Sequence, residues 1–121
     1  MNFRDRRIYN RYKTNLKGKI ALPKGSAFSV DIIDVSIEGA RLRTDSPVLM
    51  FEGEVINLLI KWDKPIKIQA EIRWIKEGKL NTEFGVKFIE MDMANREALA
   101  SLVSEHAFSS IINSSSREFK K

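Results

Sequence analysis

IKIQAEIRWI, residues 66–75, alternates apolar and polar side chains with a period of two. Successive side chains of a β-strand point to opposite faces, so this run predicts a strand with one buried and one solvated face. The turn formers Asp63-Lys64-Pro65 and Lys76-Glu77-Gly78 bound the run. The residues expected on the buried face are Ile66, Ile68, Ala70, Ile72 and Trp74.

The same period recurs in five further runs that are separated by turn-forming stretches. The expected strands are residues 12–22, 28–32, 40–43, 54–61 and 80–88. In the last of these, Leu80 and Phe84 are expected to face inward with the other even-numbered residues. Six short antiparallel strands indicate a small closed barrel, because closure removes the exposed edges that an open sheet would leave.

The period changes to that of a helix after the sixth run. Asp92 is the expected N-cap, and residues 95–106 have a helix-forming composition. One stripe of this helix should pack on the sheet or plug one end of the barrel. The stripe comprises Leu99, Leu102, Val103 and His106. The expected fold class is therefore mostly all-β, a six-stranded antiparallel barrel with a C-terminal α-helix.

Composition agrees with one cytoplasmic domain that needs no cofactor. The chain has 121 residues, of which 43% are hydrophobic, enough for a single core. It has no apolar run long enough to span a membrane, no secretory signal and no cysteine. We expect one domain over residues 1–108, and the serine-rich residues 109–121 predict a disordered tail.

Positive charge is concentrated near the N-terminus. Residues 1–24 hold eight Lys and Arg and one acidic residue. The remaining residues hold thirteen Lys and Arg and fifteen acidic residues. Arg7 and Arg11 are four apart, so in an extended segment they lie on the same side. Guanidinium groups pair bidentately with phosphate oxygens and with the guanine edge, so the pair predicts a site for a compact anion. The alternative interpretation is a solvated basic tail.

Catalytic chemistry is not expected. His106 is the only histidine, and its place on the helix stripe makes it a core or boundary residue. Asp31 and Asp34 are three apart, so in a regular strand they point to opposite faces and form a poor acid–base pair. Trp62 and Trp74 are interpreted as core residues.

Two short motifs precede and follow the first strands. RIYNR, residues 7–11, has the form RxxxR, and DVSIEG, residues 34–39, has the form DxSxxG about 27 residues later. Asp and Ser favour turns, and Gly39 can take a positive φ or admit a close neighbour. Followed by FGVKF at residues 84–88 and a helix, this order resembles the PilZ domain, the bacterial receptor module for cyclic di-GMP. The resemblance covers about residues 4–108.

The resemblance implies a six-stranded barrel with a C-terminal helix, and it implies the ligand. Arg7 and Arg11 would clasp phosphates and guanine edges from an N-terminal loop. Asp34, Ser36 and Gly39 would form the opposite wall, where a carboxylate and a hydroxyl can pair with guanine donors and a glycine would let the base approach. The alternative interpretation of residues 34–39 is an ordinary loop with a capping serine.

Three further arginines extend the expected site. Arg41 and Arg43 are candidates for additional contacts. Arg6 directly precedes RxxxR, where an arginine resembles family members that bind the ligand as an intercalated pair and an apolar residue resembles those that bind one molecule. A third guanidinium would offset the repulsion among four phosphate charges. Arg6 therefore predicts two ligand molecules per chain.

The expected function is a stand-alone cyclic di-GMP receptor whose arginine loop orders on ligand binding and which signals by docking on a partner protein. Two alternatives stay open. One is a PilZ-like adaptor that binds its partner without ligand. The other is a small barrel that binds single-stranded nucleic acid, favoured by Tyr9 and Tyr12 beside the arginines and disfavoured by the inward positions of most aromatic residues.

Overall fold

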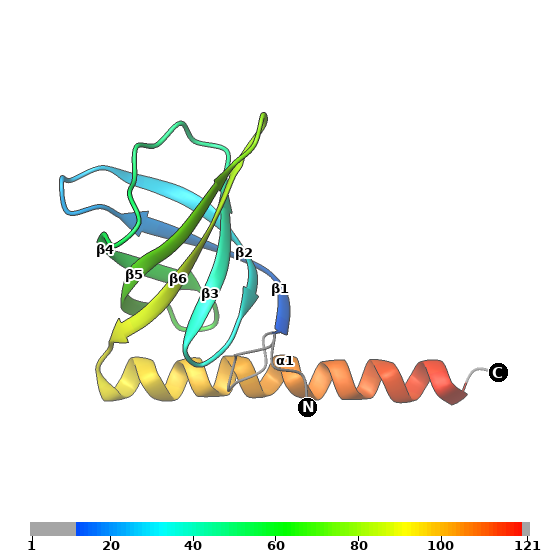
Figure 1. Cartoon of the computed structure of the whole chain (residues 1–121). Coiled ribbons are helices and arrows are strands. Elements are labelled where there is room, and N and C mark those ends of the chain that lie inside the picture. Colours follow the sequence, from blue (N-terminus) through cyan, green and yellow to red (C-terminus); the bar gives the residue numbers. More distant parts are fainter. Residues whose placement is uncertain (1–11, 120–121) are drawn as a thin grey trace, which may run out of the picture.

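The computed structural model describes the backbone of residues 12–119 and the side chains of residues 12–108. Six strands are followed by one helix (Figure 1). The elements are β1 (Tyr12–Ala21), β2 (Ala27–Val35), β3 (Gly39–Thr44), β4 (Val55–Lys61), β5 (Ile66–Glu77), β6 (Thr82–Glu90) and α1 (Met93–Phe119).

The strands form a closed barrel in the order β1-β2-β3-β6-β5-β4, with every neighbouring pair antiparallel. Pairing of β1 with β4 closes the sheet, with Gly18 opposite Ile60. Closure pairs the backbone groups of strands that would otherwise be exposed edges. The predicted six-stranded antiparallel barrel with a C-terminal helix is confirmed.

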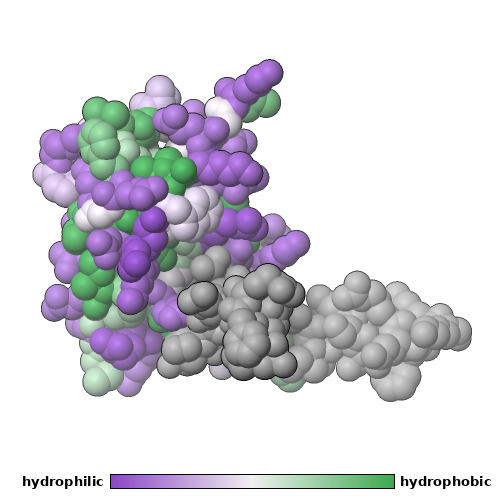
Figure 2. All heavy atoms as spheres, in the orientation of Figure 1, coloured by the Kyte–Doolittle hydropathy of each residue, from purple (hydrophilic) through white to green (hydrophobic). Residues whose placement is uncertain are grey.

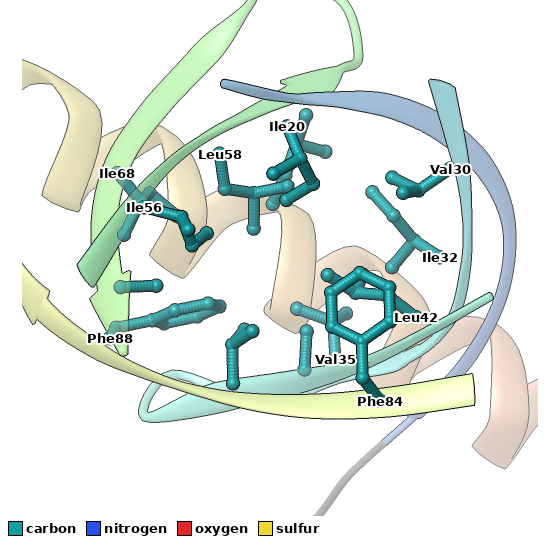
Figure 3. Packing of buried hydrophobic residues seen from close by; sticks show 14 of the residues in the cluster. Ile20, Val30, Ile32, Val35, Leu42, Ile56, Leu58, Ile68, Phe84 and Phe88 are labelled. Carbon is teal, nitrogen blue, oxygen red and sulfur yellow. The ribbon is translucent and has the colours of Figure 1, made fainter. Parts of the chain in front are cut away.

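Inward side chains from all six strands fill the barrel (Figure 3). Ile20, Ile32 and Leu58 are among the side chains that are essentially inaccessible to solvent. The rings of Phe28 and Phe84 pack across the interior with centroids 6.3 Å apart, in the tilted arrangement that aromatic pairs prefer. The coloured part of the face seen in Figure 2 is largely hydrophilic and is broken by apolar patches, as period-two alternation predicts for a sheet with one wet face.

The helix crosses one end of the barrel (Figure 1). Leu99 and Leu102 are buried members of the core, and Val103 packs against it. The N-cap prediction is confirmed, because the backbone N–H of Asn95 donates to Asp92 Oδ1 over 2.9 Å. This hydrogen bond, followed by one from the Asn95 side chain, holds the pKa of the Asp92 carboxyl below its ordinary value.

The helix is longer than the sequence analysis expects. It begins at Met93 and continues to Phe119, so residues 109–119 are helical where a disordered tail is predicted. The stretch contains no glycine or proline that would end the helix. Figure 1 shows its later turns extending beyond the barrel. Within the described residues, no helix is both long and apolar enough to cross a membrane.

A β-bulge in β2 changes which residues share a face. Asp31 pairs with Arg43 and Ile32 with Leu42, but the next pair joins Asp34 to Arg41, so Ile33 is an extra residue. Asp31 and Asp34 therefore lie on the same outer face. The prediction that they point to opposite faces is wrong, because it assumes a regular strand.

A second bulge, in β5, corrects the prediction for Trp74. Ile72 pairs with Val86, whereas Trp74 pairs with Gly85, so Arg73 is the extra residue. Val86 is in the core, and its neighbour Gly85 belongs to the outer face. Trp74 therefore lies on the outside, and Ile75 packs against the core in its place.

Leu80 is also placed differently from the prediction. It lies in the turn between β5 and β6, and it is 88% exposed. The sixth strand begins only at Thr82, because the chain first closes a turn in which the N–H of Gly78 donates to the carbonyl of Asn81 over 2.8 Å.

Replacing Leu102 by alanine tests the packing of α1 on the barrel. Leu102 is completely buried, so Leu102→Ala should lower the free energy of unfolding by about 2–5 kcal/mol. Leu80→Ala is the matched control, and the same change at this exposed site should cost no more than about 0.5 kcal/mol. Urea denaturation measures both. Similar losses in the two variants would contradict the docking of the helix.

Candidate functional site

The candidate site lies on the outer face where β2 and β3 pair. Asp34 lies opposite Arg41 across the two strands, and the Arg41 Nε lies 3.2 Å from Asp34 Oδ2. The Asp34 side chain is only 12% exposed. A carboxylate that is this well buried needs charged or hydrogen-bonding partners, and the Arg41 guanidinium supplies a charged one. The structure thus brings together Asp34 and Arg41, two of the predicted site residues.

Arg43 takes part in a second ion-pair group on the same face. Asp31 accepts a hydrogen bond from Lys17 Nζ and lies 3.4 Å from Arg43 Nη2. The hydrogen bond from Lys17 is the main reason that the pKa of Asp31 lies below its ordinary value. Arg43 is therefore paired with Asp31, two residue pairs along the strands from the Asp34–Arg41 pair.

Ser36 holds the turn between β2 and β3. Its hydroxyl oxygen accepts hydrogen bonds from the backbone N–H groups of Glu38 and Gly39, over 3.1 Å and 3.2 Å. The Ser36 N–H donates to the Gly39 carbonyl over 2.9 Å, and the residue is 1% exposed. The hydroxyl thus caps the turn, as expected for an ordinary loop with a capping serine. This structural role was the alternative to a ligand contact.

Gly39 is required by its neighbour across the sheet. Among the described residues, only Gly25 and Gly53 have a positive φ, so Gly39 does not use the left-handed conformation. A Cβ at Gly39 would overlap the carbonyl oxygen of Val86 on β6. A close neighbour of Gly39 is expected from the sequence, and in the structure this neighbour is the backbone of β6.

A concave cavity of about 300 Å³ opens beside this turn. Residues 36 and 38–40, from the turn and the start of β3, line one part of it, and residues of β5 and β6 line the rest. Arg73, Trp74 and Lys87 are lining residues that the sequence analysis does not assign to the site. The register shift that brings Trp74 here could not be predicted from the sequence, because the alternation of apolar and polar residues continues through Trp74 with a period of two. Within the described residues, no group of acidic side chains or histidine could hold a metal ion.

The predicted arginines Arg6, Arg7 and Arg11 lie outside the described residues. The first described residues after them fix where β1 begins. Tyr12 pairs with Val35, and Lys13 pairs with Asp34. The start of β1 and the DxSxxG motif therefore meet on neighbouring strands.

Comparison with known proteins identifies relatives of this arrangement. A family model described as PilZ domain matches residues 5–105. No curated protein sequence matches the chain. The solved structure of the PilZ domain of Escherichia coli YcgR with c-di-GMP is similar, with a TM-score of 0.73 and 15% identity over 92% of this chain and 98% of that one.

Two longer proteins contain a similar fold. MrkH of K. pneumonia in its apo state has a TM-score of 0.77 at 15% identity over 93% of this chain. Bacillus subtilis MotI/DgrA, described as an inhibitor of motility, has a TM-score of 0.73 at 17% identity over 87% of this chain. The chain spans about half the length of these two relatives, 55% and 53%. At such identities the likeness shows the fold.

Gly39→Ala distinguishes a structural role from a ligand-facing one. If the carbonyl of Val86 sets the need for glycine, the added methyl group should lower the free energy of unfolding by about 1–3 kcal/mol in the free protein. Chemical denaturation without any ligand measures this. Unchanged stability of the free Gly39→Ala variant would show that the barrel tolerates a side chain at this position.

Proposed function

Because the chain belongs to the PilZ domain family, we propose that it is a cytoplasmic receptor for cyclic di-GMP and not an enzyme. One observation carries the proposal. Tyr12 and Lys13, which directly follow the RxxxR motif, pair with Val35 and Asp34, where the DxSxxG motif begins. The chain that directly follows the RxxxR motif is thus paired with the start of the DxSxxG motif, which supports a shared site for the two motifs.

The chemistry of the ligand matches these groups. Cyclic di-GMP offers two anionic phosphates and two guanines. In this proposal Arg7 and Arg11 pair with phosphate oxygens and the guanine O6/N7 edge. The Asp34 carboxylate accepts from guanine N–H groups, and its ion pair with Arg41 holds it in place. Ser36 and Gly39 contribute by shaping the turn that presents Asp34.

Signalling in this proposal depends on the N-terminal segment. Arg6, Arg7 and Arg11 close onto the barrel when the ligand binds, and the surface that they create docks on a partner protein. The ordering cost is subtracted from the binding energy, so the affinity is lower than the contacts alone would give. Hydrogen exchange in residues 1–11, compared with and without ligand, is the direct measure of this closing.

Arg11→Ala tests the site assignment. A charge-assisted contact is worth roughly 1.5–3 kcal/mol, so the variant should bind cyclic di-GMP about tenfold to a hundredfold more weakly or worse. Arg96→Ala is the control, because Arg96 is an exposed residue of α1. Calorimetric titration with cyclic di-GMP measures both variants, and the thermal midpoints of the free proteins should stay nearly unchanged.

The same titration separates the proposal from its alternatives. GTP and a single-stranded oligonucleotide serve as competing ligands. Tight binding of the oligonucleotide alone would indicate a nucleic-acid-binding barrel. An unmodified protein that binds no cyclic di-GMP would indicate a ligand-independent adaptor, and normal binding by Arg11→Ala would remove the arginine from the site.

Arg6 leads to a prediction about stoichiometry. If Arg6 offsets the charge of a second ligand molecule, the unmodified protein should bind two molecules of cyclic di-GMP per chain, and Arg6→Leu should shift the ratio towards one. Titration at protein concentrations well above the dissociation constant gives the ratio. One molecule per unmodified chain would refute this role, whatever the variant does.

A further inference from the structure

Lysines gather on the outer face of the barrel where β1, β4 and β5 lie side by side. Each of them alternates along its strand with buried residues and is itself exposed. Lys17 lies opposite Lys61, and on the next outward-facing rung Leu59 lies between Lys19 and Lys67. Neighbouring strands are about 4.8 Å apart, so these side chains form one patch. We call the five residues the lysine face.

The positive charge of the lysine face is only partly neutralised. Lys17 forms an ion pair with Asp31. The other three lysines form no ion pair within the described part of the chain. The pKa of Asp92 is lowered by its hydrogen bonds with Asn95 and, to a smaller degree, by the charge of Lys67. The face thus retains an excess of positive charge.

The folding of the barrel does not explain this arrangement. Like charges directly opposite each other on neighbouring strands destabilise a sheet, and Lys17 opposite Lys61 is such a pair. Lysines protect exposed sheet edges from pairing with other chains, but β1 and β4 pair with each other in the closed barrel. The lysine face is therefore better explained by a partner that supplies negative charge.

An apolar groove passes through the lysine face. It has a volume of about 320 Å³, and its lining includes Lys19, Leu59 and Lys67. Leu59 is half-buried, and the outward-facing Ala21 and Ala27 extend the apolar lining. The stems of lysine side chains are apolar as well, so an apolar side chain of a partner fits between two positively charged head groups.

The lysine face lies on the opposite side of the barrel from the candidate site. In the closed order of strands, β1 is three strands away from β6, and β4 is three strands away from β3. Figure 3 shows β1 (blue) and β6 (yellow) on opposite sides of the core. Although β5 contributes to both, Lys67 is near its start and Trp74 near its end. A partner on the lysine face therefore leaves the cavity beside the β2–β3 turn uncovered.

We propose that the lysine face is a docking surface for an acidic segment of a partner protein. The segment places an apolar side chain in the groove beside Leu59 and carboxylates on Lys19 and Lys67. This surface is present with or without cyclic di-GMP, unlike a surface that the N-terminal arginines would create on ligand binding. Its charge gives specificity and a fast encounter, and the groove adds apolar contact.

The composition of the lysine face favours a protein over other anionic partners. Surfaces that bind single-stranded nucleic acid add aromatic side chains or arginines that stack on bases, and the lysine face and its groove contain neither. Membrane surfaces are bound through large apolar side chains that enter the lipid, whereas Leu59 is half-buried in the sheet.

Binding of a fluorescein-labelled peptide, in which glutamates flank a single leucine, tests the proposal by fluorescence anisotropy. We expect Lys19→Glu/Lys67→Glu to weaken binding by at least about tenfold, because like charges then face each other. Lys76→Glu/Lys79→Glu is the matched control, since it changes the net charge equally at exposed positions around the β5–β6 turn. No binding by the unmodified protein, or equal binding by the two double variants, would overturn the proposal.

Further arms of the same experiment identify what binds and where. A peptide with serine in place of the leucine should bind at least about threefold more weakly, because it loses the apolar contact, and equal binding of both peptides would overturn the role of the groove. Tighter binding of a single-stranded oligonucleotide, or of vesicles that contain phosphatidylglycerol, would overturn the assignment to a protein. Loss of peptide binding in Arg11→Ala, with normal binding by Lys19→Glu/Lys67→Glu, would place the peptide on the N-terminal arginines instead.

Calorimetry with cyclic di-GMP separates this proposal from the proposed function. Lys19→Glu/Lys67→Glu should bind cyclic di-GMP as the unmodified protein does, and saturating cyclic di-GMP should leave the peptide bound. Release of the peptide by cyclic di-GMP would contradict two separate surfaces. A protein that binds the peptide but no cyclic di-GMP would overturn the proposed function and support the docking surface.

Discussion

An extra residue in β2 is the constraint on which the outer face of this barrel depends. Ile32 and Val35 both belong to the core although they are three residues apart, a spacing that strict alternation cannot place on one face. The bulge at Ile33 changes the phase of the strand by one residue. Asp34 thereby faces outward beside Arg41 and away from the apolar interior, where an unpaired carboxylate would be costly.

The bulge in β5 has the same effect on the other side of the cavity. Ile72 is buried and Ile75 packs on the core, again three residues apart, with Arg73 as the extra residue between them. Both bulges turn side chains toward the outside while the core stays filled. The cavity beside Ser36 and Gly39 depends on this second bulge, because the far wall of the cavity includes Trp74.

Local patterns were enough to predict the architecture and part of the site. The apolar residues that recur every second position predicted the strands, and Asp92 with the leucines that follow it predicted how the helix begins and packs. Trp74 could not be placed, because it continues the period of two and only its register with Gly85 reveals its true face. Asp31 and Asp34 were misplaced for the same reason. The roles of Arg6, Arg7 and Arg11 stay predictions, because these residues lie outside the described part of the chain.

The turn between β2 and β3 has a consequence for how such a pocket can diverge. Ser36 accepts backbone hydrogen bonds, and Gly39 leaves room for the carbonyl of Val86. Both residues are therefore needed for the folding of the barrel. A related protein that no longer binds the nucleotide would still need Ser36 and Gly39 to fold. The serine and glycine of the DxSxxG motif are therefore expected to persist after ligand binding is lost. The turn does not require the side chain of Asp34, so the residue at this position should change when a related protein loses ligand binding.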